Sequence, residues 1–154
     1  MKITILAVGQ KMPKWVAPAY LEYEKRLPTR VKLIEIAAEK RTKNSQPQTL
    51  KDKEAERILK HIQPQDYVIA LDERGQTWST QQLAEQYQTW HDQNHNLCLL
   101  IGGPDGLAQT CLSRANATWS LGHLIYPHPL VRIILIEQLY RAYSICTNHP
   151  YHRA

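Results

Sequence analysis

Residues 97–106 read LCLLIGGPDG, a continuous apolar run that ends in a glycine-rich loop. An apolar run without alternation is typical of a strand that is buried on both faces of a parallel sheet. The loop Ile101–Gly106 follows this strand and precedes a short helix predicted from Leu107. Glycines here let the backbone approach a ligand closely and adopt positive φ. The stretch therefore predicts an α/β fold with a backbone-lined pocket at a strand end. A tight turn without a ligand is the alternative.

Strands and helices alternate on both sides of that stretch. Further strands are predicted at Ile3–Gly9, Val31–Ala37, Tyr67–Leu71 and Thr118–Leu121. Helices are predicted at Trp15–Leu27, at Lys51–His61, from Ser79 and at Leu130–Cys146. In the helix that begins at Ser79, Gln82 is the capping-box partner, and Leu83, Tyr87 and Trp90 lie on the buried face. The polar segment Glu39–Gln48 is predicted to be a mobile surface loop. Residues 1–154 are expected to form one domain, a parallel sheet flanked by helices.

Composition narrows the classes of protein that remain. The formal net charge is +5, which favours a polyanionic partner without establishing one. The three cysteines are odd in number and have no C-x-x-C spacing, so free thiols in a reducing compartment are expected. The first apolar run is too short for a secretory signal, and no run approaches the length of a membrane span. A cytoplasmic protein without membrane association is the expectation.

The loops after the strands are the candidate ligand site. In an open parallel sheet, ligands bind beyond the carboxyl ends of the strands. Three segments are expected to converge there: Leu71-Asp72, Ile101–Gly106 and Leu121–Tyr126. The loop lacks the G-x-G-x-x-G pattern and the Gly-Lys-Ser/Thr pattern, which disfavours a dinucleotide site and a phosphate-binding P-loop.

The segment Pro127–Arg132 is predicted to be stiff, because each residue before a proline is restrained to extended conformations. Such a loop fixes the direction of His128, although a helix cap or a solvent-facing histidine is the alternative. The helix that follows is apolar almost all round at its start, where only Arg132 is polar. Burial against a second subunit is favoured, and a central helix wedged against the sheet is the alternative.

The end of the chain concentrates residues that bind nucleic acids. Residues 148–153 read NHPYHR, and such side chains stack on bases, bind phosphate and shuttle protons. Glu137 and Arg141 are spaced for a surface ion pair. His91 and His95 lack a third metal ligand, so no metal site is expected.

These segments together resemble the RlmH family of SPOUT-superfamily methyltransferases. The motifs are MKITILAVG at the start, IGGPDG after the fourth strand, PHPLVRIILIEQLYRAYSI in the last helix and NHPYHR at the end. The resemblance implies S-adenosylmethionine as cofactor and N3 of a pseudouridine in large-subunit (23S) ribosomal RNA as acceptor. It also implies homodimers that act on assembled ribosomes, and a C-terminal trefoil knot that periodicity does not predict.

The resemblance also assigns site residues. Cofactor binding is expected at Leu71, Gly102, Gly103, Leu121, Gly122, His123, Leu124, Ile125 and Tyr126, with no catalytic role for His123. From the chemistry of their side chains, we expect the acceptor side at His128, Arg132, Tyr151, His152 and Arg153. In a dimer, the tail could act within its own chain or across the interface. His128, His152 and Glu137 are candidates for the proton acceptor, because N3 carries a proton at neutral pH. Arg132, Arg141 and Arg153 are candidates to stabilise the anion or to hold phosphates.

A different class of protein remains as an alternative. A non-catalytic, ribosome-associated factor would bind RNA through the basic residues alone, and the glycine loop would then be a plain turn. Binding of S-adenosylmethionine distinguishes the two.

Overall fold

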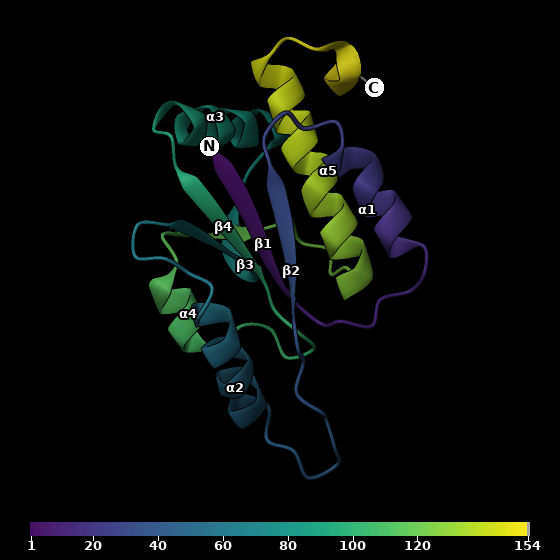
Figure 1. The fold of residues 1–154 in the computed structure, drawn as a ribbon, viewed down its shortest axis with the longest axis vertical. Helices are drawn as coiled ribbons and strands as arrows, with labels where there is room; N and C mark the ends of the chain where they lie inside the picture. The colour runs from purple at the N-terminus through teal and green to yellow at the C-terminus, as the bar shows by residue number, and fades with distance from the viewer. Residues whose placement is uncertain (154) are drawn as a thin grey trace.

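Five parallel strands form the central sheet of the computed structural model, which describes residues 1–153 (Figure 1). Their order is β2-β1-β4-β3-β5, so β4 is the middle strand. The strands are β1 (Lys2–Val8), β2 (Val31–Ile36), β3 (Tyr67–Thr77), β4 (Asn96–Ile101) and β5 (Ala117–Ser120). Each neighbouring pair is parallel. The parallel sheet predicted from the apolar run at 97–101 is confirmed.

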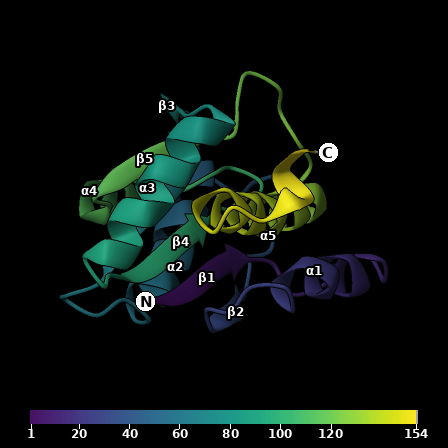
Figure 2. The same cartoon turned by 90° about the horizontal axis from the view of Figure 1, so that it is seen from above.

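Helices cover both faces of this sheet (Figures 1 and 2). They are α1 (Val16–Glu24), α2 (Pro47–Leu59), α3 (Thr80–Asp92), α4 (Gln109–Arg114), α5 (His128–Cys146) and a terminal 3₁₀ turn, η1 (Pro150–Arg153). Successive side chains of β1 point to opposite faces of the sheet and so pack against different helices. Ile5 and Ala7 join the core shared with α1, α3 and α5, whereas Leu6 and Val8 join the core shared with α2 and α4. Both faces of the central strands are therefore buried.

The start of α3 follows the sequence signals closely. Ser79 Oγ accepts from the Gln82 backbone N–H at 3.1 Å, and Gln82 Oε1 accepts from the Ser79 backbone N–H at 2.9 Å. This reciprocal pair is the predicted capping box. Leu83, Tyr87 and Trp90 are buried on the sheet side, as their spacing predicts.

Strand β3 is longer than predicted, and its extension shapes the site. The predicted strand ends at Leu71, but pairing with β5 resumes at Gln76 after residues 72–75 bulge out of register. Gly75 permits the return, because a Cβ there would lie 2.6 Å from the carbonyl carbon of Thr118. The charged residues of the bulge interrupt the apolar pattern of the strand, so the sequence does not indicate that β3 continues beyond Leu71. The bulge places them over the carboxyl edge of the sheet.

Helix α2 begins at Pro47, four residues before the predicted start. Proline suits the first turn of a helix, where its missing N–H costs nothing. The segment predicted as a mobile loop ends at Gln46 and makes specific contacts. Ser45 Oγ accepts from the Thr42 backbone N–H at 2.8 Å, and Arg41 reaches both α2 and the glycine loop.

Helix α5 lies between α1 and α3 against the sheet (Figure 2). Leu135, Ile136 and Leu139 are fully buried there. Arg132, the polar residue at the apolar start of the helix, is itself only 2% exposed. The apolar character of α5 is therefore largely explained within one chain, as a central helix. The homodimer and the trefoil knot stay predictions.

Among the residues described, no helix has both the length and the apolar character that a membrane crossing requires. In the same part of the chain, no three His, Cys, Asp or Glu side chains gather as a metal site would need. Cys98 and Cys111 are buried free thiols, and Cys98, a residue of β4, packs in the core as its apolar setting predicts.

Candidate functional site

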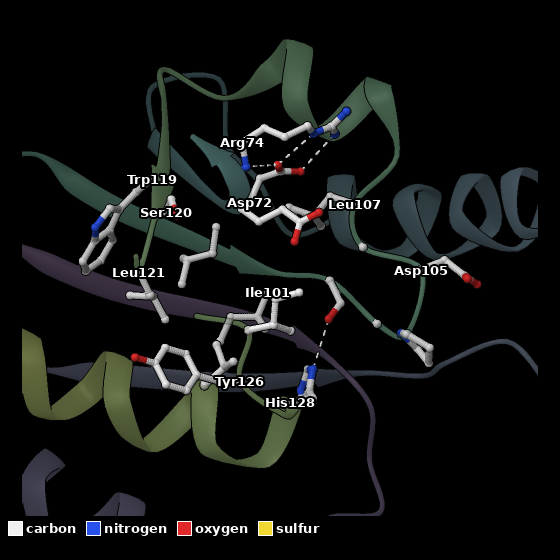
Figure 3. Close-up of a pocket in the computed structure, with 18 of the residues that line it drawn as sticks. Asp72, Arg74, Ile101, Asp105, Leu107, Trp119, Ser120, Leu121, Tyr126 and His128 are labelled. Carbon is white, nitrogen blue, oxygen red and sulfur yellow. Dashed lines mark hydrogen bonds and ion pairs between the residues drawn. The ribbon is translucent and has the colours of Figure 1, made fainter. Parts of the chain in front are cut away.

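A cavity of about 620 Å³ opens at the carboxyl ends of β3, β4 and β5 (Figure 3). Its walls are Leu71–Arg74, Ile101–Leu107 and the turn from Trp119 to Tyr126, together with residues of α2 and α5. The three predicted segments thus meet at one place. Small-molecule sites typically measure about 300–1,000 Å³, so the cavity suits a ligand of nucleoside size.

The residues predicted to bind a cofactor line this cavity, with one exception. The lining includes Leu71, Gly102, Gly103, Leu121, Gly122, Leu124, Ile125 and Tyr126. His123 is exposed and is not part of the lining. Leu124 and Ile125 are 72% and 83% exposed, so the segment offers apolar side chains to solvent at the cavity mouth.

The glycine loop is held tightly by its own backbone. A Cβ on Gly102 would lie 2.5 Å from the carbonyl carbon of Gly106, and the Gly106 N–H donates to the Gly103 carbonyl at 3.0 Å. Gly106 has φ +81°, which disfavours any side chain, yet its Cβ position is open. Gly102 is therefore required by close approach, and Gly106 by its backbone conformation.

His128 supports the glycine loop from α5 (Figure 3). Its Nδ1 lies 3.0 Å from the Gly102 carbonyl, and its Nε2 lies 3.1 Å from Nε of Arg132. Arginine only donates, so Nε2 is the acceptor and Nδ1–H donates to Gly102. Burial, aided by the charge of Arg132, holds the pKa of His128 below its ordinary value. His128 is thus a neutral imidazole whose two nitrogens are both engaged.

Arg132 lies behind His128 and does not line the cavity. Its two terminal nitrogens donate to Glu35 Oε2 and to the Gly9 carbonyl, both at 2.6 Å. The guanidinium therefore links the ends of β1 and β2 to the first turn of α5. Because it is buried and lies outside the cavity lining, Arg132 is placed as a positioning residue for His128.

The state of His128 has a consequence for stability at low pH. Its folded pKa lies below its unfolded value of about 6.5, so the unfolded chain binds more protons in that interval. The contribution of His128 is therefore complete above about pH 6.5 and is lost as pH falls toward the folded pKa. Asparagine at 128 keeps a donor for Gly102 but does not titrate. We expect His128→Asn to reduce the acid-side slope of the unfolding free energy, measured by urea titration at several pH values. An unchanged slope would contradict the assignment.

Charged residues at the rim come mainly from the β3 bulge. Asp72 accepts from the Arg74 backbone N–H at 2.8 Å and from its guanidinium at 3.1 Å. The hydrogen bond from the Arg74 side chain lowers the pKa of the Asp72 carboxyl. Glu73 is exposed on the same bulge. The rim therefore carries charges of both signs, with Lys51 and Arg74 beside the carboxylates.

The C-terminal tail lies along the second half of α5, away from His128. Tyr151 Oη donates to Glu137 Oε1 at 2.8 Å, and the Arg141 guanidinium sits 5.1 Å from the Tyr151 ring centroid. Glu137 follows His128 by more than two helical turns, about 13 Å along the axis. Within one chain, the structure does not bring His128 together with the tail residues Tyr151, His152 and Arg153.

Glu137 is occupied as the anchor of this tail. It accepts from Tyr151, from Arg141 at 2.6 Å and from Gln138 at 2.6 Å. The predicted pair of Glu137 and Arg141 exists, but it is more shielded than a surface pair, with side chains 15% and 21% exposed. Both carboxylate oxygens of Glu137 are therefore engaged by donors within this chain.

The sequence does not reveal the residues that bind His128, Arg132 and the glycine loop on the side away from the cavity. No local sequence pattern points to Glu35, Gly9, Arg41 or Glu54 as residues of the site. Glu35 and Arg132 are far apart along the chain, so no local spacing links them.

A family model and the sequence relatives place the chain in one family. Residues 1–152 match the family model described as "Predicted SPOUT methyltransferase". Proteins named ribosomal RNA large subunit methyltransferase H are 48% identical in Nitrosococcus oceani (100% of this chain and 99% of the relative) and 50% identical in Hahella chejuensis (99% of both). A probable methylase family protein from Haemophilus influenzae has a TM-score of 0.57 at 13% identity, covering 97% of this chain and 69% of that one. At that identity the likeness concerns the fold alone.

Proposed function

Because the chain belongs to the SPOUT methyltransferase family, we propose that it transfers a methyl group from S-adenosylmethionine to ribosomal RNA. The acceptor is N3 of a pseudouridine in the large-subunit (23S) RNA of the assembled ribosome. The observation that carries the proposal is the meeting of three loops around one cavity at the strand ends. The family match also favours an enzyme over a non-catalytic ribosome-associated factor.

The cavity fits the parts of this cofactor. Leu71 and Leu121 offer apolar walls to the adenine, and the backbone near Gly102 and Gly122 offers polar groups without crowding side chains. The exposed carboxylate of Glu73 on the β3 bulge favours a cation such as the sulfonium. When bound, the cofactor supplies an electrophilic methyl group. The chain contributes mainly position, which lowers the barrier to an in-line displacement.

Proton removal from N3 falls to His152 in this proposal. His128 and Glu137 are already occupied by donors. Ser144 Oγ donates to the Arg141 carbonyl at 2.7 Å, so it is an acceptor toward His152 Nδ1, 3.5 Å away. That arrangement leaves Nε2 of His152 as a free acceptor. Burial and the bond to Glu137 raise the pKa of Tyr151, which stays protonated and can hold the RNA through its hydroxyl group.

A dimer brings the tail to the cavity. Within one protomer His152 lies along the far half of α5, so the proposal requires the tail of one protomer to reach the cavity of its partner. Exposed apolar residues support a contact there. Trp15 at the start of α1 is 51% exposed and Leu130 at the start of α5 is 38% exposed. Both helices begin at the carboxyl edge of the sheet, and α5 begins beside the cavity.

Mixed dimers test this arrangement. Gly102→Val damages the cofactor side, and His152→Ala removes the base, which is worth about 10²–10⁴ in rate. We expect each variant alone to be nearly inactive in transfer of labelled methyl groups to ribosomes. A mixture that has exchanged subunits should recover about a quarter of wild-type activity, because half of the dimers are mixed and each has one intact site. Full activity of His152→Ala alone would refute the role of His152. An inactive mixture of properly exchanged dimers would refute the crossing of the tail.

A further inference from the structure

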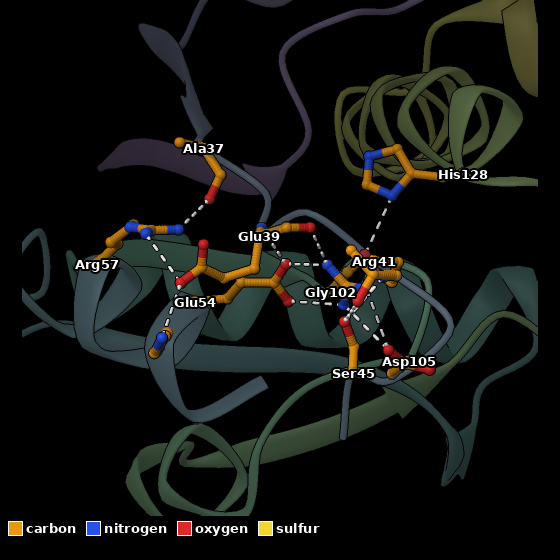
Figure 4. A network of polar contacts seen from close by, with 11 residues as sticks. Ala37, Glu39, Arg41, Ser45, Glu54, Arg57, Gly102, Asp105 and His128 are labelled. Atoms are coloured by element: carbon orange, nitrogen blue, oxygen red, sulfur yellow. Dashed lines mark hydrogen bonds and ion pairs between the residues drawn. The ribbon is translucent and has the colours of Figure 1, made fainter. Parts of the chain in front are cut away.

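Side chains bind the glycine loop at both of its ends, and only one of them, His128, belongs to α5. His128 binds its first residue, Gly102, at 3.0 Å. At the other end, the carboxylate of Asp105 accepts from Arg41, from Nε at 3.2 Å and from a terminal guanidinium nitrogen at 3.1 Å (Figure 4). Arg41 comes from the segment between β2 and α2, far away in sequence. Asp105 lines the cavity, whereas Arg41 does not.

Arg41 is itself fixed by a buried carboxylate on α2. Glu54 is 2% exposed and accepts from both terminal nitrogens of Arg41, one of them at 3.1 Å. It also accepts from the Glu39 backbone N–H at 2.9 Å, and the Glu39 carbonyl accepts from Arg41 at 3.0 Å. A carboxylate buried this deeply requires a close counter-charge. The rigid fork of the guanidinium therefore has little freedom to turn away from Asp105.

Glu54 also lies directly behind the loop. A Cβ on Gly103 would lie 2.9 Å from the Val8 side chain and 3.4 Å from Glu54 Oε1. The loop thus rests on the same carboxylate that orients Arg41. Glu39 extends the network outward, since it pairs with Arg57 at 3.3 Å. Figure 4 shows that these contacts converge on the loop from the side opposite to His128.

We propose that Arg41 is a positioning residue for the cofactor site, because it ties the Asp105 end of the glycine loop to the buried carboxylate of Glu54. With His128 at the other end, the loop is held open at a fixed width before any ligand arrives. A preformed site avoids the cost of ordering a loop on binding. The identity of the ligand rests on the function proposed above, but the tether itself is a property of the free protein.

The alternative is that Arg41 only neutralises Glu54. Asp105 separates the two roles, because Asp105→Ala cuts the tether and leaves the Arg41–Glu54 pair in place. Arg41→Lys keeps the charge but loses the forked geometry that spans both carboxylates. Lys43→Ala removes an exposed cation from the same segment and serves as the matched control.

The first measurement is amide hydrogen exchange of residues 103–107 in the free protein. We expect Asp105→Ala and Arg41→Lys each to speed this exchange about tenfold, whereas Lys43→Ala leaves it unchanged. The melting temperature of Asp105→Ala should stay near that of the wild type. Unchanged exchange in Asp105→Ala would overturn the proposal and leave Arg41 with a purely structural role.

The second measurement is the dissociation constant of S-adenosylmethionine by calorimetry. We expect about tenfold weaker binding for either variant and no further loss in the double variant, since both cut one tether. Additive losses would overturn the shared tether. If the wild type binds no cofactor while loop exchange still responds as expected, the tether stands and the proposed function fails.

Discussion

Arg132→Met is expected to lower the unfolding free energy by about 3 kcal/mol, because it removes a buried cation that serves three partners. The substitution leaves the Gly9 carbonyl and the His128 ring nitrogen without a donor, and Glu35 without its counter-charge. Breaking a fully buried pair costs about 3–5 kcal/mol, and the 38% exposure of the Glu35 side chain places the expectation at the low end. Urea unfolding with an unchanged m-value measures the loss.

Arg26→Met is the control for that experiment. Arg26 also pairs with a carboxylate, that of Glu22 one helical turn away at 2.7 Å, but both side chains are substantially exposed. Such pairs contribute about 0–1 kcal/mol. If Arg132→Met costs no more than Arg26→Met, Arg132 does not link the strand ends to α5 as described.

Gly102→Ala is expected to weaken S-adenosylmethionine binding by at least about 100-fold, because the new methyl group meets backbone and not a movable side chain. Its Cβ would lie 2.5 Å from the Gly106 carbonyl carbon and 2.8 Å from the Leu107 nitrogen. The loop must therefore open, which also moves the carbonyl that His128 binds.

Gly106→Ala is the contrasting variant. Its Cβ meets no atom within 4 Å, so only the positive φ of +81° opposes the change. That conformation costs about 1–2 kcal/mol, or roughly tenfold in affinity if the whole cost falls on binding. Calorimetry should therefore give a much lower affinity for S-adenosylmethionine in Gly102→Ala than in Gly106→Ala. The reverse order would show that backbone conformation, and not close approach, governs the loop.

The sequence predicts the fold well where one short segment contains the whole signal. The apolar run before Gly102 identifies a buried parallel strand, and Ser79 with Gln82 marks a helix start. Both signals depend on neighbours within a few residues. The extension of β3 is not predicted, because the need for Gly75 in its bulge arises only from the nearby backbone of Thr118, which is distant in sequence.

For the site too, the residues that line the cavity could be predicted from the sequence, whereas the contacts behind them could not. The walls Leu71, Gly102 and Leu121–Tyr126 could be proposed from strand ends and from the resemblance, and all but His123 line the cavity. The roles of His128 and Arg132 could not be predicted, because their partners Gly102, Gly9 and Glu35 are set by tertiary packing. A stiff loop fixes where His128 lies but not which atoms its nitrogens meet.

The tail illustrates a further limit. Its residue types suggest proton transfer and RNA binding, but its place depends on the contact of Tyr151 with Glu137. No local pattern encodes that contact. The cavity and the tail lie apart in one chain, and the proposed dimer joins them.

Mass spectrometry of ribosomal RNA tests the central claim most directly. The chain is expressed in a bacterial strain that lacks its own enzyme of this type, and nucleosides of the large-subunit RNA are compared with those of the empty strain. We expect a single additional methyl group, located on N3 of one pseudouridine, which disappears when Gly102→Ala replaces the wild type. Unchanged large-subunit RNA in cells that contain the folded protein, or a methyl group on another base, would contradict the account.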